Sequence, residues 1–199
     1  MGSSQSIDAA AVKLFTIRPL NTKVGTQFMA GPQIHHVALL VANLEAAIER
    51  WSAATGYTFS PVGRYCTERY ADSSNPKPHH HDARIAFSKE GPPHIELMEF
   101  TGEGTHSVSQ GEGFHHLGFM DYPNVEGRLK ELAELGFGHD GMALTDDDRI
   151  LLFFTEKADL NGMRLEYVAE LPQPIIKDDG SEPYLDDRGF PGLWPPGNE

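Results

Sequence analysis

Two segments of the chain, residues 34–39 and residues 114–119, share one pattern of apolar and polar positions. Each begins with an apolar residue, continues with two histidines and ends in a run of apolar or small residues. Both contain residue types suited to buried strands. Because the same pattern recurs 80 positions later in one chain, it predicts the opening strands of two equivalent, duplicated halves.

A helix is predicted directly after each of these strands. Asn43 and Asn124 each precede an apolar residue and a glutamate. Asparagine can cap free backbone amides, and glutamate suits the positive end of a helix. Gly56 and Gly136 predict where the two helices end. Apolar positions recur at helical spacing and define one buried face per helix, formed by Leu44, Ile48 and Trp51 in the first half and by Val125, Leu129 and Leu132 in the second.

Short runs with β-strand character complete the two halves. They cover residues 83–88 and 94–100 in the first half, and residues 150–155 and 163–168 in the second. The fold class that follows is α+β, with a strand, a helix and further strands repeated once.

The segments outside this repeat are less regular. Residues 1–32 carry little periodicity and are predicted to wrap the domain as an N-terminal extension. Residues 70–81 contain two prolines and three consecutive histidines, His79 to His81, and are interpreted as a loop that could also bind a metal adventitiously or form a lid. Residues 170–199 form a proline-rich C-terminal tail, which is expected to be extended rather than helical. The predicted domain spans residues 33–169. Its two modules span residues 33–104 and 112–169.

Each half closes with a glutamate between two apolar residues. Glu96 follows Ile95, and Glu166 follows Leu165. Strand alternation turns each glutamate to the opposite face from both of its neighbours. An ionised carboxylate on an inward face needs a compensating partner, and a cation is one of the few groups that can provide it. The pattern therefore indicates a bound cation.

The histidine pairs would supply the remaining ligands of such a cation. One histidine and one glutamate from each half would give a metal two nitrogen and two oxygen ligands. This mixed set suits one divalent ion of zinc, manganese, cobalt, nickel or iron, and it argues against an all-thiolate structural site. Alternation lets only one member of each pair face the metal. The other member is expected to bond to backbone or contact a helix.

Composition narrows the class of function. With 29 acidic and 16 basic side chains the net charge is -13, which repels nucleic acids and anionic lipid surfaces. The lone Cys66 excludes an intramolecular disulfide, and no stretch of the sequence is long and apolar enough for a membrane span. We therefore expect a cytoplasmic protein that binds a small-molecule substrate, with no nucleic acid or membrane partner. A homodimer is compatible with the sequence.

Four short sequence motifs resemble those of one known family. They are Ile34-His35-His36-Val37-Ala38, Ile95-Glu96-Leu97, Gly113-Phe114-His115-His116-Leu117 and Arg164-Leu165-Glu166. Together they resemble the vicinal oxygen chelate superfamily, the group of glyoxalase I, methylmalonyl-CoA epimerase, extradiol dioxygenases and fosfomycin resistance proteins. The resemblance covers residues 33–169. Within it, residues 111–116 are most similar to the methylmalonyl-CoA epimerase branch.

The resemblance implies a fold, a ligand set and a class of substrate. The fold would be two βαβββ modules that form a curved mixed sheet around a metal-binding cleft. The second histidine of each pair would be the ligand, which gives His36, Glu96, His116 and Glu166 as the metal set. The substrate would bind the metal through adjacent oxygens. Glu68 is the nearest candidate for a second catalytic carboxylate beside Glu166.

Three functions are compatible with this resemblance. In the leading hypothesis the metal stabilises the enolate that forms when a carboxylate, Glu166 with Glu68 as its partner, removes a proton beside a carbonyl. The chain would then be an isomerase, epimerase or lyase. The second hypothesis is a ferrous extradiol-type dioxygenase, a class that uses two histidines and one carboxylate as ligands. The third is a non-catalytic resistance protein that sequesters a ligand in the same cleft.

Overall fold

The computed structural model of the chain describes residues 31–181 and 183–185. The predicted wrapping of the N-terminal extension and the last part of the predicted tail lie outside the described residues.

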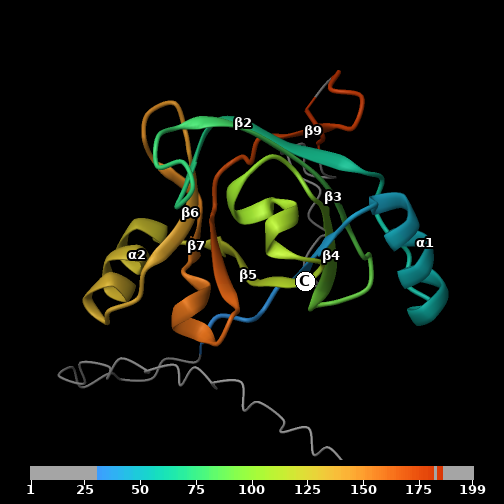
Figure 1. Ribbon diagram of the computed structural model, residues 1–199, viewed down its shortest axis with the longest axis horizontal. Helices are drawn as coiled ribbons and strands as arrows, with labels where there is room; N and C mark the ends of the chain where they lie inside the picture. Colours follow the sequence, from blue (N-terminus) through green and yellow to red (C-terminus); the bar gives the residue numbers. More distant parts are fainter. Residues whose placement is uncertain (1–30, 182, 186–199) are drawn as a thin grey trace, which may run out of the picture.

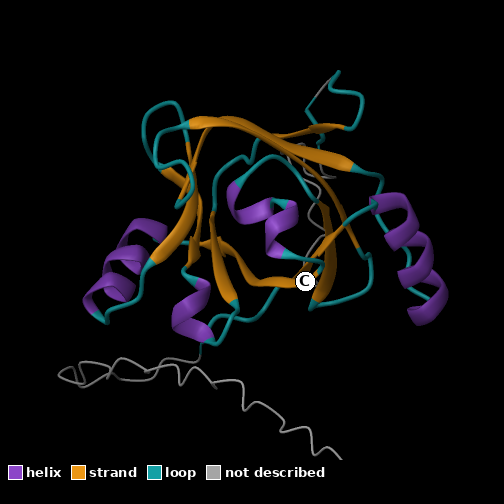
Figure 2. Ribbon diagram, viewed as in Figure 1, coloured by secondary structure: helices purple, strands orange, loops and turns teal. Residues whose placement is uncertain are grey.

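Both halves of the chain have the same order of elements (Figures 1 and 2). The first half consists of β1 (His36–Val41), α1 (Leu44–Thr55), β2 (Gly63–Asp72), β3 (His79–Phe87) and β4 (His94–Glu99). The second half consists of β5 (Gly113–Tyr122), α2 (Val125–Glu134), β6 (His139–Leu144), β7 (Ile150–Thr155) and β8 (Arg164–Ala169). The shorter elements are the 3-10 helices η1 (Gly104–His106), η2 (Val108–Gln110) and η3 (Lys157–Leu160), and the strand β9 (Ile175–Lys177). Each half is thus a βαβββ module.

The strands of the described residues form one mixed sheet that curves until it closes on itself. Their order is β3-β4-β1-β5-β8-β7-β6-β2-β9, and β2 also pairs with β3. The first strands of the two modules, β1 and β5, pair antiparallel. Each of them also pairs in parallel with the last strand of its own module, β4 or β8. The predicted α+β class, with two modules on a curved mixed sheet, is confirmed.

Each helix begins at the asparagine that the sequence predicts. The side chains of Asn43 and Asn124 accept hydrogen bonds from backbone amides three residues further on, at 2.8 Å and 2.9 Å. Gly56 caps α1 in the left-handed conformation, with φ 77°, which costs glycine no steric strain. Gly136 also has a positive φ, two residues beyond the last residue of α2. The two helices lie outside the closed sheet (Figure 2).

Strand alternation divides the buried apolar residues into three clusters. One lies beneath α1 and includes Leu44 and Leu97. A second lies beneath α2 and includes Val125 and Phe153. The third lines the interior of the closed sheet and includes Ala38, Tyr70, Ala83, Ile85, Met98, Leu152, Phe154 and Val168. The first two clusters fix the helices to the sheet, and the third surrounds the candidate site.

The loop predicted over residues 70–81 is shorter in the structure. The strands β2 and β3 extend into it from both sides, so that only residues 73–78 connect them. Tyr70 pairs with His79 across this hairpin. Pairing with neighbouring strands therefore outweighs the loop-forming composition at both ends of the segment.

The part of the predicted tail that the structure describes includes one strand. β9 pairs antiparallel with β2. Asp178, directly after β9, forms an ion pair with Arg84 on β3, and the same guanidinium binds Glu45 of α1 and Glu99 of β4. One side chain thus joins four segments of the chain. Among the described residues, no helix is long and apolar enough to cross a membrane.

Acid should destabilise the fold through His81, which is buried against Tyr70. Burial, together with the neighbouring His79, lowers the pKa of His81 from 6.5 to about 4. Below pH 6.5 the unfolded chain therefore binds this proton more readily than the folded chain. We expect the free energy of unfolding to fall by about 3 kcal/mol between pH 6.5 and about 4 because of this residue.

Urea titrations at several pH values would measure this loss. The variant His81→Gln keeps a polar side chain of similar size but does not titrate, so its free energy of unfolding should fall less steeply with acid. An identical pH dependence in the two proteins would contradict the prediction.

Candidate metal centre

Two histidines meet inside the closed sheet, where β1 pairs with β5. His36 lies opposite Gly118, and His116 lies opposite Ala38, in the antiparallel register. Both imidazoles are buried. Their Nε2 atoms lie 2.9 Å apart. The second histidine of each repeated pair therefore reaches the centre of the fold.

Two glutamates approach the same point from the strands on either side. Glu166 lies on β8 and Glu96 on β4, and both are buried. The Oε2 atom of Glu166 lies 3.1 Å from Nε2 of His36 and 3.3 Å from Nε2 of His116. The Oε2 atom of Glu96 lies 3.4 Å and 3.3 Å from the same two nitrogens. Four adjacent strands, β4, β1, β5 and β8, thus bring the four residues together.

The close approach of His36 depends on Gly118. A Cβ atom at this position would overlap the imidazole of His36. Ala38 occupies the equivalent position of the first repeat, where it lies opposite His116. Glycine at position 118 therefore lets His36 turn its Nε2 atom toward the other three side chains.

These four side chains fit a divalent cation. The Oε2 atom of Glu96 is buried and makes no hydrogen bond, which is costly for a carboxylate unless a cation compensates it. Ligands bound at about 2.1 Å lie about 3.0–3.4 Å apart in tetrahedral or octahedral coordination. The five separations that involve a histidine nitrogen are 2.9 to 3.4 Å. His36, His116 and Glu166 form the group whose donor atoms all lie within 4.8 Å of one another, and Glu96 adds a carboxylate beside the two histidines. Imidazole nitrogens with carboxylate oxygens suit zinc, manganese, cobalt, nickel or iron.

The charges of the cluster are strongly coupled. Burial alone would lower the pKa of His116, but the carboxylates of Glu166 and Glu96 raise it to about 9. Burial would likewise raise the pKa of Glu166, but His116 and His36 hold it well below its usual range. A proton on His116 therefore compensates the buried negative charge when no metal is bound, and a metal must displace this proton.

Each central histidine also contacts the first histidine of its pair. The Nδ1 atom of His35 lies 3.0 Å from that of His36, and the Nδ1 atom of His115 lies 2.8 Å from that of His116. A histidine that binds a cation through Nε2 carries its proton on Nδ1 and can donate it to such a neighbour. The outer histidines thus fix the orientation of the inner ones. His115 is held in turn through Nε2, which lies 2.8 Å from the carbonyl oxygen of Thr105.

His115 lies on a different side of the strand from the one that simple alternation predicts. A β-bulge leaves His115 without a partner in the ladder between β5 and β1. As a result the rings of both His115 and His116 contact Phe154 inside the closed sheet. A bulge changes the direction of a side chain in this way, and the sequence carries no pattern that distinguishes it.

A family profile described as the Glyoxalase/Bleomycin resistance protein/Dioxygenase superfamily matches residues 35–153. The chain belongs to this superfamily. The predicted resemblance is thereby confirmed at the level of the superfamily. None of the curated proteins matches the chain in sequence.

Solved structures share the fold of this superfamily member at low sequence identity. A hypothetical protein from Bacillus halodurans C-125 is 18% identical with a TM-score of 0.50, and the match covers 71% of this chain and 96% of that one. A variant of methylmalonyl-CoA epimerase from Streptomyces coelicolor, in complex with 2-nitronate-propionyl-CoA, is 17% identical with a TM-score of 0.49 and coverages of 72% and 97%. The epimerase from Mycobacterium tuberculosis is 18% identical with a TM-score of 0.46 and coverages of 73% and 95%. The first of these similarities shows the fold alone.

The connection between the two modules enters the interior of the closed sheet. The helices η1 and η2 lie within the ring of strands in Figures 1 and 2, and we call residues 104–110 the plug. Thr105 and His106 of the plug are buried. The cavity that remains beside Glu96 and Glu166 has a volume of about 30 Å³, which holds no more than a few water molecules.

Thr105 anchors the plug through three contacts. Its backbone amide donates to Oδ2 of Asp72 at 3.2 Å, and its hydroxyl lies 2.6 Å from that of Tyr70. Its carbonyl oxygen is the partner of His115 described above. The next residue, His106, packs against His81 and His115. Its pKa lies well below the usual value, mainly because the ring is buried and also because these two histidines are close. Sequence reasoning missed the plug because its small and polar residues are typical of a surface linker.

The structure does not bring Glu68 to this centre. Its side chain is 78% exposed and its Oε1 atom lies 2.7 Å from Nδ1 of His80 on the outer face of the sheet. The other four predicted site residues, His36, Glu96, His116 and Glu166, do come together.

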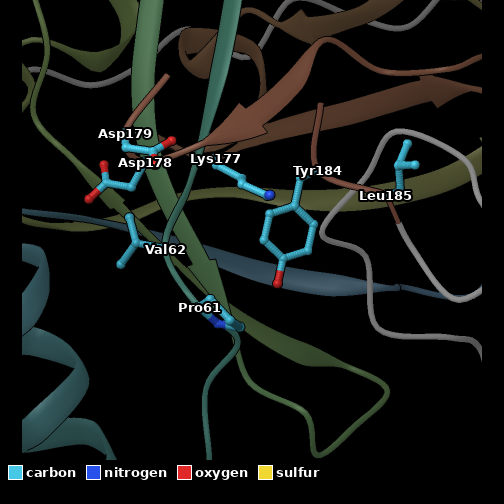
Figure 3. A pocket seen from close by; sticks show the side chains of 7 residues that line it. All are labelled: Pro61, Val62, Lys177, Asp178, Asp179, Tyr184 and Leu185. Carbon is cyan, nitrogen blue, oxygen red and sulfur yellow. The ribbon is translucent and has the colours of Figure 1, made fainter. Parts of the chain in front are cut away.

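A larger pocket lies on the outer surface, away from these residues. It has a volume of about 710 Å³ and is found where β9 meets the start of β2 (Figure 3). Its lining consists of Pro61, Val62, Lys177, Asp178, Asp179, Tyr184 and Leu185. None of the four candidate ligands contributes to its lining.

Metal content should depend on the four central side chains. We expect the full chain, purified without a histidine tag and dialysed against a weak chelator, to retain about one equivalent of transition metal. The variants His116→Ala and Glu166→Ala should lose it, because each removes one donor and leaves a buried charge uncompensated. Glu170→Gln, at an exposed position just beyond β8, is the matched control and should retain it. Elemental analysis gives the result, and equal metal content in all four proteins would contradict the assignment.

Metal affinity should also fall when Gly118 is replaced. Gly118→Ala is expected to push the imidazole of His36 away and weaken metal binding by about tenfold or more, as measured by competition with a chromophoric chelator. Gly31→Ala is the matched control, since a Cβ there meets nothing within 4 Å. Unchanged affinity in Gly118→Ala would show that His36 does not bind the metal.

Proposed function

We propose that the chain is a metal-dependent isomerase, epimerase or lyase that moves a proton next to a carbonyl group of a small, oxygen-rich metabolite. The observation that carries the proposal is the Oε2 atom of Glu96, which is buried beside two imidazoles and another carboxylate yet makes no hydrogen bond. Membership of the superfamily supports it, because that group includes glyoxalases. A divalent ion held by His36, Glu96, His116 and Glu166 would act as a Lewis acid toward the carbonyl oxygen.

Glu166 is the residue that we propose as the base. Its carboxylate lines the small cavity at the centre, where it would act as a base after loosening from the metal. An ionised carboxylate can accept a proton from a carbon that is held beside it. Glu68 has no part in this proposal, because it lies on the outer face of the sheet.

The plug limits access to this site. A cavity of about 30 Å³ has no space for a metabolite beside the carboxylates. A movement of residues 104–110 out of the ring of strands would make room for a substrate. The same movement would open the centre to water, and its return would close the site again around a bound substrate.

The ligand set favours proton transfer over oxygen chemistry. The extradiol-type assignment requires two histidines and a single carboxylate, which His36, His116 and Glu166 would supply, but a second carboxylate lies beside the same two histidines. Glu96 is the additional donor. A further protein ligand leaves fewer positions for a diol and dioxygen to bind side by side.

Exchange of a carbon-bound proton with solvent tests the proposal. We expect the metal-loaded full chain in deuterated water to exchange the proton next to the carbonyl in at least one member of a panel of α-hydroxy ketones, α-keto hemithioacetals and acyl thioesters. Mass spectrometry would detect the added deuterium. Glu166→Gln should abolish the exchange, and the exposed control Glu170→Gln should not.

Two results would overturn the proposal. If the metal-loaded chain exchanges no member of the panel, proton transfer at this site is not supported. If the iron-loaded chain consumes oxygen with catechols, the dioxygenase assignment replaces it.

A further inference from the structure

A second group of metal-binding side chains lies on the outer face of the β2–β3 hairpin. Cys66 and Glu68 alternate along β2, and His80 and Asp82 alternate along β3. Cys66 is the direct cross-strand partner of Asp82. Between His80 and Asp82, His81 is buried on the inner side of the sheet, so its two neighbours point outward.

The donor atoms of this group are close together. One ligand atom from each of Cys66, His80 and Asp82 lies within 4.8 Å of the others. The Oε1 atom of Glu68 adds a fourth donor, 2.7 Å from Nδ1 of His80. Because the side chains of His80 and Glu68 are 55% and 78% exposed, they can rotate to close around an ion without disturbing the core. We call these four residues the hairpin cluster.

The hairpin cluster contains two carboxylates, those of Glu68 and Asp82, and one of them is paired with Arg64. Burial, followed by the carboxylate of Asp82, raises the pKa of the Cys66 thiol. Arg64 opposes this effect on the pKa, and Glu68 adds to it more weakly. A cation bound here would stabilise the thiolate and relieve the repulsion between it and the two carboxylates.

One neighbouring cation is already present but does not block the cluster. Arg64 donates to both carboxylate oxygens of Asp82, and from Nη1 also to the carbonyl oxygen of Asp178 at 3.3 Å. Each carboxylate oxygen can accept two interactions. Asp82 can therefore hold Arg64 and still offer a free lone pair to an ion on the side of Cys66.

We infer that Cys66, His80 and Asp82, with Glu68 beside them, form a second, exchangeable site for a divalent transition metal on the outer face of the β2–β3 hairpin. A thiolate, an imidazole and carboxylates together suit zinc, cobalt or nickel rather than magnesium or calcium. The site shares no residue with the buried centre, and it does not depend on the proposed function. It also differs in chemistry, because a thiolate is available only here.

Titration of the metal-free full chain with cobalt would separate the two sites. A thiolate bound to cobalt gives a near-ultraviolet charge-transfer band, whereas imidazole and carboxylate ligands do not. We expect the wild-type chain to bind about two equivalents, of which one gives this band. Cys66→Ser should remove the band and one equivalent. His116→Ala should remove the other equivalent and leave the band unchanged.

Two further variants distinguish a built site from a lone thiol. His80→Ala and Asp82→Asn should each weaken cobalt binding at the site that gives the band by about tenfold or more. His139→Ala, an exposed histidine at the start of β6, is the matched control and should leave it unchanged. No band at saturating cobalt would overturn the inference. A band that both variants leave unchanged would also overturn it, since the thiol would then bind the ion adventitiously.

Discussion

The buried carboxylates at the centre of the closed sheet determine much of the arrangement around them. Taking a carboxylate out of water costs several kcal/mol even after the protein relaxes, and Glu96 and Glu166 both lie within 3.4 Å of the same imidazole nitrogens. A cation must compensate them, either as a proton on His116 or as a metal ion. This requirement explains why side chains from four adjacent strands come together inside the sheet. It also explains why Gly118 leaves room for the ring of His36.

Duplication provides the symmetry of the centre, and the connection between the modules breaks it. Each module contributes one imidazole and one carboxylate from paired parallel strands. Only the second module has the bulge that turns His115 inward, and only there does the outer histidine bind the plug through Thr105. The orientation of His116 is thus linked to the position of the plug, whereas that of His36 is not linked to it in this way.

Much of this arrangement follows from short-range sequence patterns, and the rest depends on contacts between distant segments. The repeated histidine pairs, the flanked glutamates and the helix caps all follow from local rules of alternation and capping, so they could be predicted. The bulge at His115 and the inward position of His81 result from pairing with other strands, which no local pattern encodes. The position of Glu68 in the chain predicts a second catalytic carboxylate, but alternation along β2 places its side chain on the outer face. The burial of Thr105, His106 and Ser107 in the plug arises from their fit inside the closed sheet, since the composition of this segment is that of a linker.

The contacts of the plug set a limit on how readily the centre can be reached. Thr105 makes three polar contacts with residues outside the plug, Asp72, Tyr70 and His115, and each is worth about 1 kcal/mol net. Opening would also expose the neutral ring of His106 and the apolar lining beside it. The open state would therefore be a minor population. The apparent affinity for a substrate would equal the intrinsic affinity multiplied by the fraction of molecules that are open. A substrate that also gains contacts with the displaced plug would recover part of this cost, which would favour ligands larger than the cavity itself.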